Sequence, residues 1–496
     1  MGGEYRSGQG WSGRGWSGRE LLVLFAITGV AAALRLFRIE QWSVSATEAA
    51  TWRSITQPMD GASGILAGEA GPYPLVPLAL RWLIDVGLLP FHGEGWLRLP
   101  FAFAGIVAVP LAALVANLVA ARGAALLAAG LLAVHPWHVA QSQTADPAGI
   151  ALLFSLGSMA AAVAGRGASR WPYRLLCAFG AMLTLLTHAA GWLLLFLLAA
   201  GWVASRWPAA SPRGRRLLAG ALLLGLLLPP LAVAAVGPLD GAPVEVVGEA
   251  LRSFAEALGV PLLIVAVASM ALWRPAPGRV LLGVLTPIAA ACLAEALGFR
   301  TGPDVLLFLL PPFLLLAAVA MLRCFELVRA GLPGGPRPAV AAAALAPFAL
   351  GCSLLVDTVL YSVAHQGFRP PWRLAAGATL NRVGTGRGLL VGAAVGWPNL
   401  NFYLRPNHWR GSATDPHPGI RVAALDLADP IAALRELVAA ARGASVAVAL
   451  RCDEVDRVDA LPAGKALLRR SFRLERVLPC PLDMRDETLY VFRAVD

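Results

Sequence analysis

The sequence predicts an all-α domain that crosses a membrane many times, followed by a small C-terminal α/β domain. Hydrophobic residues make up 57% of the 496 residues and charged residues only 14%, and the mean hydropathy is +0.66. Soluble domains are about a quarter charged. The hydrophobic residues form long blocks, and a charged, mixed composition begins after residue 360. These observations exclude a soluble enzyme, a collagen-like chain and a disordered chain.

Hydrophobic blocks predict eleven membrane spans. Each is long enough to cross about 30 Å of hydrocarbon at about 1.5 Å per helical residue. The blocks lie near 20–38, 97–119, 123–140, 148–165, 172–188, 190–206, 216–236, 259–273, 279–297, 304–323 and 339–360. The first block ends in Arg35-Leu36-Phe37-Arg38 without a small-residue cleavage site, which favours an uncleaved span over a signal peptide. Residues 74–89 are interrupted by prolines and charges, so we expect them to lie as a helix in the membrane interface.

Arginines predict the orientation of these spans. The net charge is +11, and most of the excess is arginine in short loops between the blocks. If the N-terminus is cytoplasmic, the short outer loops hold only Arg252 and Arg300, as the positive-inside rule requires. This distribution explains the basic charge without nucleic-acid binding. We therefore expect a cytoplasmic segment at 1–19, a transmembrane domain at 20–360 with a long first outer loop at 39–96, and an extracytoplasmic domain at 361–496.

The C-terminal region predicts alternating strands and helices. Strands are expected at 388–394, 421–425, 446–450 and 489–493. A helix is expected to begin at Pro430, because Asp429 can cap it and proline is favoured at the first helical position. Cys452 and Cys480 also lie in this region, and they could form a disulfide if it is extracytoplasmic.

Acidic residues collect at the predicted outer ends of the spans. Asp146 and His188 lie at such ends, and Glu48 and Glu69 lie in the first outer loop. Ionisable groups are costly in a membrane, so their position is informative. They could converge on one outward-facing cavity. Alternatively, acids are found outside only because arginines occupy the inner side.

No pattern in the sequence indicates a metal or a soluble cofactor. His135 and His138 have the spacing of one helix face, but the sequence offers no further ligands, and a metal site needs them. Hydrogen bonding at the span boundary is the simpler interpretation of this pair.

An ordered series of motifs resembles the GT-C membrane glycosyltransferases, in particular the family 39-like group that includes protein O-mannosyltransferases and the bacterial aminoarabinose transferase acting on lipid A. The motifs span most of the chain, from the first outer loop to the start of the C-terminal domain. They are Gln41-Trp42-Ser43, Thr47-Glu48-Ala49, Gly71-Pro72-Tyr73-Pro74-Leu75, Leu97-Arg98-Leu99-Pro100, His135-Pro136-Trp137-His138, Ser142-Gln143-Thr144-Ala145-Asp146-Pro147, Thr187-His188, Leu309-Leu310-Pro311-Pro312 and Arg369-Pro370-Pro371-Trp372-Arg373.

The resemblance implies a GT-C fold and transfer of a sugar from a polyprenyl-phosphate donor to an envelope acceptor (lipid, glycan or protein) at the outer face of the cell membrane. Glu48 and Asp146 match the acidic positions and are the catalytic candidates, and Glu69 is a further acid. His188 and Arg300 are candidates for the donor phosphate. Membrane lipid is an expected partner, and no cofactor is implied.

Departures from the family pattern at Thr47 and at Asp304-Val305 keep an inactive relative open as an alternative, and a transporter is a second alternative. The leading aspartate of the family's first-loop acidic pair is replaced by Thr47, which then becomes a substrate-binding candidate. The chain could be an inactive relative that binds lipid-linked sugar or acts as a scaffold. It could also be a transporter or lipid flippase, although such proteins usually place ionisable groups near the bilayer midplane.

Overall fold

The structure, a computed structural model, describes most of the N-terminal half and of the C-terminal third of the chain. The described residues are 15–56, 73–89, 93–165, 171–188, 307–331, 337–363, 369–380, 389–393, 397–404, 420–426, 428–440, 445–482, 485–486 and 488–495, with a few isolated positions between 191 and 262. The predicted spans at 190–206, 216–236, 259–273 and 279–297 lie outside the continuous ranges. Glu69 and Arg300 also lie outside them.

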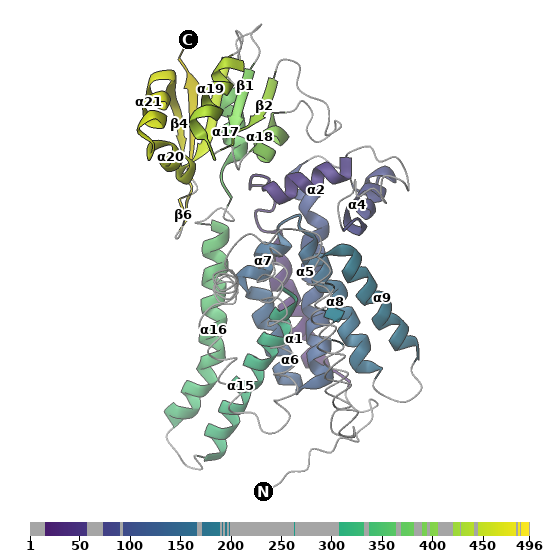
Figure 1. Cartoon of the computed structure of the whole chain (residues 1–496). Helices are drawn as coiled ribbons and strands as arrows, with labels where there is room; N and C mark the ends of the chain where they lie inside the picture. Colours follow the sequence, from purple (N-terminus) through teal and green to yellow (C-terminus); the bar gives the residue numbers. More distant parts are fainter. Residues whose placement is uncertain are drawn as a thin grey trace, which may run out of the picture.

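Helices form the larger part of the described structure (Figure 1). They are α1 (Gly18–Leu36), α2 (Ala46–Thr56), α4 (Leu75–Asp85), α5 (Glu94–Val119), α6 (Arg122–Val134), α7 (Pro136–Ser142), α8 (Pro147–Ala164), α9 (Trp171–Thr187), α15 (Leu310–Gly331) and α16 (Arg337–Val363). Within the described ranges, three helical segments are long and apolar enough to cross a membrane, and the bent pair α6 and α7 would make a fourth. Every predicted span in these ranges coincides with a helix, although α15 is shifted toward the C-terminus.

The span predicted at 123–140 is wrong in one respect, because it is two helices rather than one. The axes of α6 and α7 differ by 61°. His135 is extended between them, with φ −71° and ψ 122°. Pro136 causes the break, since proline disfavours a helical conformation in the residue before it and is itself favoured at the first position of a new helix.

Buried polar side chains cap the helix ends near this break. Arg35 in α1 donates from Nη1 to the carbonyl of Ala133 at 3.0 Å and from Nη2 to that of Leu132 at 3.3 Å. These are the last carbonyls of α6, and they would otherwise lack a partner inside a membrane. The side chain of Arg35 also contacts His138 Nδ1, which confirms hydrogen bonding for one of the two histidines.

The carbonyls at the end of α1 are satisfied in return. Gln143 donates from Nε2 to the carbonyls of Leu34 at 2.9 Å and Phe37 at 3.0 Å. The two segments therefore fix each other, and the chain that follows α7 has a defined position relative to α1.

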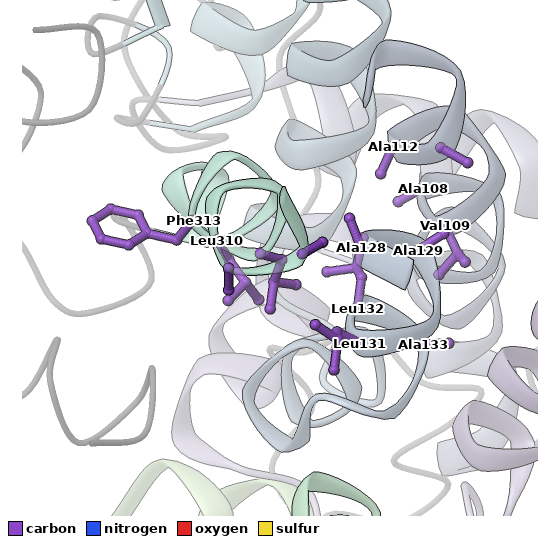
Figure 2. Packing of buried hydrophobic residues seen from close by; sticks show 14 of the residues in the cluster. Ala108, Val109, Ala112, Ala128, Ala129, Leu131, Leu132, Ala133, Leu310 and Phe313 are labelled. Atoms are coloured by element: carbon purple, nitrogen blue, oxygen red, sulfur yellow. The ribbon is translucent and has the colours of Figure 1, made fainter. Parts of the chain in front are cut away.

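Small residues allow the central helices to pack closely. Figure 2 shows Ala108 and Ala112 of α5 facing Ala128 and Ala129 of α6, with Leu310 of α15 nearby. Packing between membrane helices depends on close van der Waals contact, and alanine and glycine permit it.

Substitution of Gly105 by alanine is expected to destabilise this packing. A Cβ atom on Gly105 would lie 2.6 Å from Ser142 Cβ, so α5 and α7 would have to separate. Overpacking of this kind costs about 1–3 kcal/mol, and the thermal unfolding temperature in detergent should fall. Gly29→Ala is the matched control, because its Cβ would meet nothing within 4 Å. Equal unfolding temperatures for the two variants would contradict the close contact.

The C-terminal α/β unit is a mixed sheet flanked by helices. Its five strands have the order β2-β1-β3-β7-β4. β1 (Leu389–Ala393) is parallel to β2 (Ile420–Ala424) and β3 (Ser445–Arg451), and β7 (Leu489–Ala494) is antiparallel to β3 and β4 (Phe472–Leu478). The other elements are α17 (Trp372–Leu380), α18 (Trp397–Tyr403), α19 (Pro430–Ala440), α20 (Cys452–Asp459), α21 (Pro462–Ser471), β5 (Pro481–Leu482) and β6 (Arg485–Asp486).

The predicted strands are confirmed as β1, β2, β3 and β7, and the capped helix is confirmed as α19. Asp429 Oδ1 accepts from the Ala432 amide at 3.1 Å. β4 was missed because exposed charges interrupt its alternation. Cys452 and Cys480 are both free thiols.

The α/β unit shares a hydrophobic core with α2 and with the start of α5. Trp52 of α2 and Phe101 of α5 belong to the same buried cluster as Trp372 and Val491. Tyr403 Oη also accepts from the Val44 amide at 2.6 Å. The unit therefore lies on α2 and the nearby end of the helical bundle (Figure 1).

Candidate functional site

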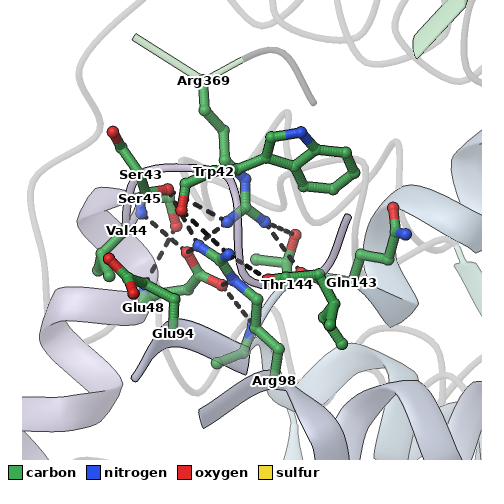
Figure 3. Close-up of polar contacts among 12 residues, drawn as sticks. Trp42, Ser43, Val44, Ser45, Glu48, Glu94, Arg98, Gln143, Thr144 and Arg369 are labelled. Carbon is green, nitrogen blue, oxygen red and sulfur yellow. Dashed lines mark hydrogen bonds and ion pairs between the residues drawn. The ribbon is translucent and has the colours of Figure 1, made fainter. Parts of the chain in front are cut away.

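Glu48, Arg98 and Arg369 form a buried ion cluster where the helical bundle meets the α/β unit (Figure 3). Arg98 Nε donates to Glu48 Oε1 at 2.7 Å, and Arg369 Nη1 donates to Glu48 Oε2 at 2.7 Å. The side chains of Glu48 and Arg98 are 0% exposed and that of Arg369 is 6% exposed. The cluster joins α2, α5 and the segment that leads into the α/β unit.

Backbone amides complete the partners of the Glu48 carboxylate. The amide of Ser45 donates to Oε2 at 2.8 Å and that of Ala145 to Oε1 at 3.0 Å. Burial alone would raise the pKa of Glu48, but the charges of Arg369 and Arg98 outweigh it and lower the pKa to about 2. The carboxylate is therefore ionised and buried, and both of its oxygens accept hydrogen bonds. These properties make it a poor proton acceptor.

The cluster also holds the turn between α7 and α8. Arg369 Nη2 donates to the Gln143 carbonyl at 3.1 Å and to Thr144 Oγ1 at 2.8 Å. From α2, Thr51 Oγ1 donates to the Ala145 carbonyl at 3.0 Å. Together with the bond from the Ala145 amide to Glu48, these contacts fix the residues that precede Asp146.

Asp146 begins α8 and is partly exposed. Its Oδ1 accepts from the Ala148 amide at 2.8 Å, and Pro147 occupies the first helical position. This N-cap satisfies one free amide of the helix and uses one carboxylate oxygen. The cap gives the side chain a defined orientation while its second oxygen keeps its acceptor capacity.

His188 is a neighbour of Asp146, and Tyr73 is a neighbour of His188. Their rings stack with centroids 6.1 Å apart and an interplanar angle of 27°. The Asp146 carboxylate lies near enough to the His188 imidazole to interact with it electrostatically. Burial raises the pKa of Tyr73. Three segments distant in sequence thus bring a carboxylate, an imidazole and a phenol together.

Comparison with solved structures identifies the architecture around this site. No protein-family model and no curated protein matches the sequence. The chain is similar to the oligosaccharyltransferase AglB of Archaeoglobus fulgidus, solved with an inhibitory peptide and a dolichol-phosphate, with a TM-score of 0.52, 12% identity, and coverage of 92% of this chain and 72% of that one. This chain has the GT-C fold. At such low identity the similarity establishes the fold and not the reaction.

Two further solved structures cover nearly all of this GT-C chain. ArnT from Cupriavidus metallidurans in the apo state gives a TM-score of 0.49 at 14% identity, covering 96% of this chain and 98% of that one. The mycobacterial arabinofuranosyltransferase AftD gives 0.44 at 15% identity, covering 97% of this chain and 40% of that one.

The GT-C fold brings some of the sequence-predicted site residues together. Glu48 bonds to the residue before Asp146, and Asp146 lies beside His188. Thr47 is exposed on α2, where its Oγ1 lies 2.9 Å from Ser45 Oγ. The Thr47-Glu48 pair is therefore divided, with the threonine facing out and the glutamate enclosed. Glu69 and Arg300 lie outside the described residues.

Sequence reasoning missed the partners of Glu48. In the sequence, Arg98 and Arg369 stand out only as members of two separate motifs. Both stand near an end of a hydrophobic block that is predicted to face outward. An outer arginine beside a hydrophobic segment is a signal for a buried carboxylate partner.

The described residues hold no group of three histidine, cysteine, aspartate or glutamate side chains that could bind a metal ion. The described side chains of the site offer a carboxylate, an imidazole and nearby hydroxyl groups.

Proposed function

We propose that this chain is a membrane glycosyltransferase. It transfers a sugar from a polyprenyl-phosphate donor to a hydroxyl group of an envelope acceptor, which is a lipid, a glycan or a protein. The observation that carries the proposal is Asp146, an accessible carboxylate on a firmly held turn at the end of a GT-C bundle, with His188 beside it. The AglB structure of the same fold was solved with a dolichol-phosphate, which is a polyprenyl phosphate.

Asp146 acts as the general base in this mechanism. An acceptor hydroxyl has a pKa far above 7, and a carboxylate within hydrogen-bond reach takes its proton as the oxygen attacks. A bond forms between this oxygen and the anomeric carbon, and the bond from that carbon to the phosphate oxygen breaks. The configuration inverts and polyprenyl phosphate leaves.

His188 stabilises the phosphate leaving group in this proposal. An imidazole N–H donates to a phosphate oxygen, and such donors stabilise the developing charge. The ion cluster carries a net positive charge, because it pairs the two arginines Arg98 and Arg369 with the single carboxylate of Glu48. This charge favours binding of an anionic phosphate.

Three further residues are proposed to contact the substrates. Arg300 is a second phosphate contact, Thr47 is a hydroxyl that contacts the substrate, and Glu69 is a further polar contact. Because phosphate is a stable leaving group, no soluble cofactor is required.

Glu48 has a different role from Asp146 in this proposal. Its lone pairs are occupied by two arginines and two amides, so it holds the loop and the turn rather than accepting a proton. The predicted topology, with eleven spans and a cytoplasmic N-terminus, places this site at the outer face of the cell membrane.

The direct test supplies membranes that contain the protein with radiolabelled polyprenyl-phosphate pentoses and hexoses. We expect label to move to lipid, glycan or protein, and membranes with the Asp146→Asn variant to serve as the matched control. Tight binding of the donor without transfer by the wild type would indicate an inactive relative. Movement of the labelled lipid between leaflets without transfer would indicate a flippase.

A further inference from the structure

We propose that Arg369 is a positioning residue for Asp146, so that the segment leading into the α/β unit sets the geometry of the active site. The importance of Asp146 rests on the proposed function. The contacts that position it do not, and they can be tested separately.

Arg369 connects the ion cluster with the turn through a single guanidinium group. One arm, Nη1, donates to Glu48 Oε2 at 2.7 Å, and the other, Nη2, donates to the Gln143 carbonyl at 3.1 Å and to Thr144 Oγ1 at 2.8 Å. The group lies over the Trp42 ring at 5.6 Å. A planar guanidinium holds two partners at a fixed separation, which an ammonium group cannot do.

These contacts cover the residues immediately before Asp146. Arg369 holds Gln143 and Thr144, and Glu48, itself paired with Arg369, holds the amide of Ala145 at 3.0 Å. After this turn, the chain enters α8 at Pro147. Figure 3 shows Gln143 and Thr144 beside Arg369. The position of the Asp146 carboxylate therefore follows from the position of the Arg369 side chain.

Arg369 is in turn fixed by the α/β unit. Pro370 and Pro371 follow it and restrict the backbone, and Trp372 is buried in the core shared with α2 and the start of α5. The Arg373 amide donates to Ser43 Oγ at 3.2 Å, and Cys480 Sγ lies 3.5 Å from the Arg369 carbonyl. A shift of the α/β unit would move Arg369, and with it the turn. The unit is thus coupled to the catalytic geometry.

The test compares Arg369→Lys with the matched control Arg373→Lys. The first keeps the charge next to Glu48 but cannot hold both Glu48 and the turn. Arg373 is 48% exposed and makes longer contacts of 3.4 Å, so its substitution should change little. Because small misplacements at an active site cost about 100-fold in rate, Arg369→Lys should lower kcat by roughly 10- to 100-fold while KM for the donor stays within about threefold.

Hydrogen exchange of residues 139–146 provides a readout without catalysis. Arg369→Lys should speed exchange of the Ala145 amide, whereas Arg373→Lys should not. Thr144→Val removes the hydroxyl that accepts the hydrogen bond from Arg369. This variant replaces Arg369→Lys in the exchange experiment if the lysine variant folds poorly.

Two results would overturn the proposal: exchange in the turn that matches wild type in both Arg369→Lys and Thr144→Val, or a folded Arg369→Lys enzyme with unchanged kcat. A wild-type protein that transfers no sugar would remove the proposed function, and the exchange data would still decide whether Arg369 positions the turn.

Discussion

Replacing Glu48 by glutamine is expected to destabilise the protein by about 3–5 kcal/mol, the usual cost of removing one partner from a buried ion pair. Arg98 and Arg369 are 0% and 6% exposed, so both cations would remain buried without the counter-charge that they share. A glutamine NH2 group would also face donors, because arginine or amide N–H groups occupy both carboxylate oxygens.

Thermal unfolding in detergent, followed at several pH values, measures this effect. The pKa of Glu48 is lowered from 4.5 to about 2 in the folded state. The contribution of Glu48 to stability is therefore complete above pH 4.5 and is lost as the pH falls toward 2. The glutamine variant should lack this dependence on pH.

The matched control is Glu326→Gln. Glu326 pairs with Arg323, and both side chains are more than 60% exposed, so loss of this pair should lower the stability by less than about 1 kcal/mol. Similar losses in the two variants would contradict the structural role of Glu48.

Replacing Asp146 by asparagine is expected to lower kcat by about 100- to 10,000-fold, the usual contribution of a general base. Stability should change little, because an asparagine oxygen can still accept from the Ala148 amide and asparagine is as good an N-cap as aspartate. The variant thus separates the chemistry from the structure of the turn. The rate of sugar transfer and the unfolding temperature are measured on the same preparations of the wild type and of Asp146→Asn.

Asp429→Asn is the control for this substitution, because Asp429 caps α19 in the same way and lies in the α/β unit. It should leave both rate and stability near wild type. If Asp146→Asn transfers sugar as fast as wild type, the base lies elsewhere, and Glu69, the further acidic candidate, would be the next residue to replace.

Much of the fold could be predicted from the sequence, because the membrane constrains helices through length and hydrophobicity. The helices α5 and α8 begin and end within a few residues of the predicted blocks. The strands β1 and β3 were found because hydrophobic residues dominate them. The break at Pro136 was not predicted, since hydropathy is continuous across it and proline alone does not say whether a helix bends or ends.

The site was predicted only in part, because spacing reveals residue types and not their partners. The predicted outer ends of Asp146 and His188 left the meeting of these two residues as one of two alternatives. The distinction between an enclosed Glu48 and an accessible Asp146 was not predicted, since it depends on Arg369, which is 321 residues from Glu48 in the sequence. Contacts over such separations are decided by how the α/β unit lies on the bundle.

The core that the α/β unit shares with α2 and the start of α5 has a consequence for biosynthesis. Val44 and Tyr403, which meet in the finished protein, are 359 residues apart, and ribosomes add about 5–20 residues per second. The segment around Val44 would therefore be synthesised roughly 20–70 seconds before its partner exists. During that interval the hydrophobic side chains of Trp52 and Phe101 lack their final covering. We expect this segment to depend on the membrane surface or an envelope chaperone while synthesis continues, and chains truncated before residue 372 to be targets for proteolytic quality control.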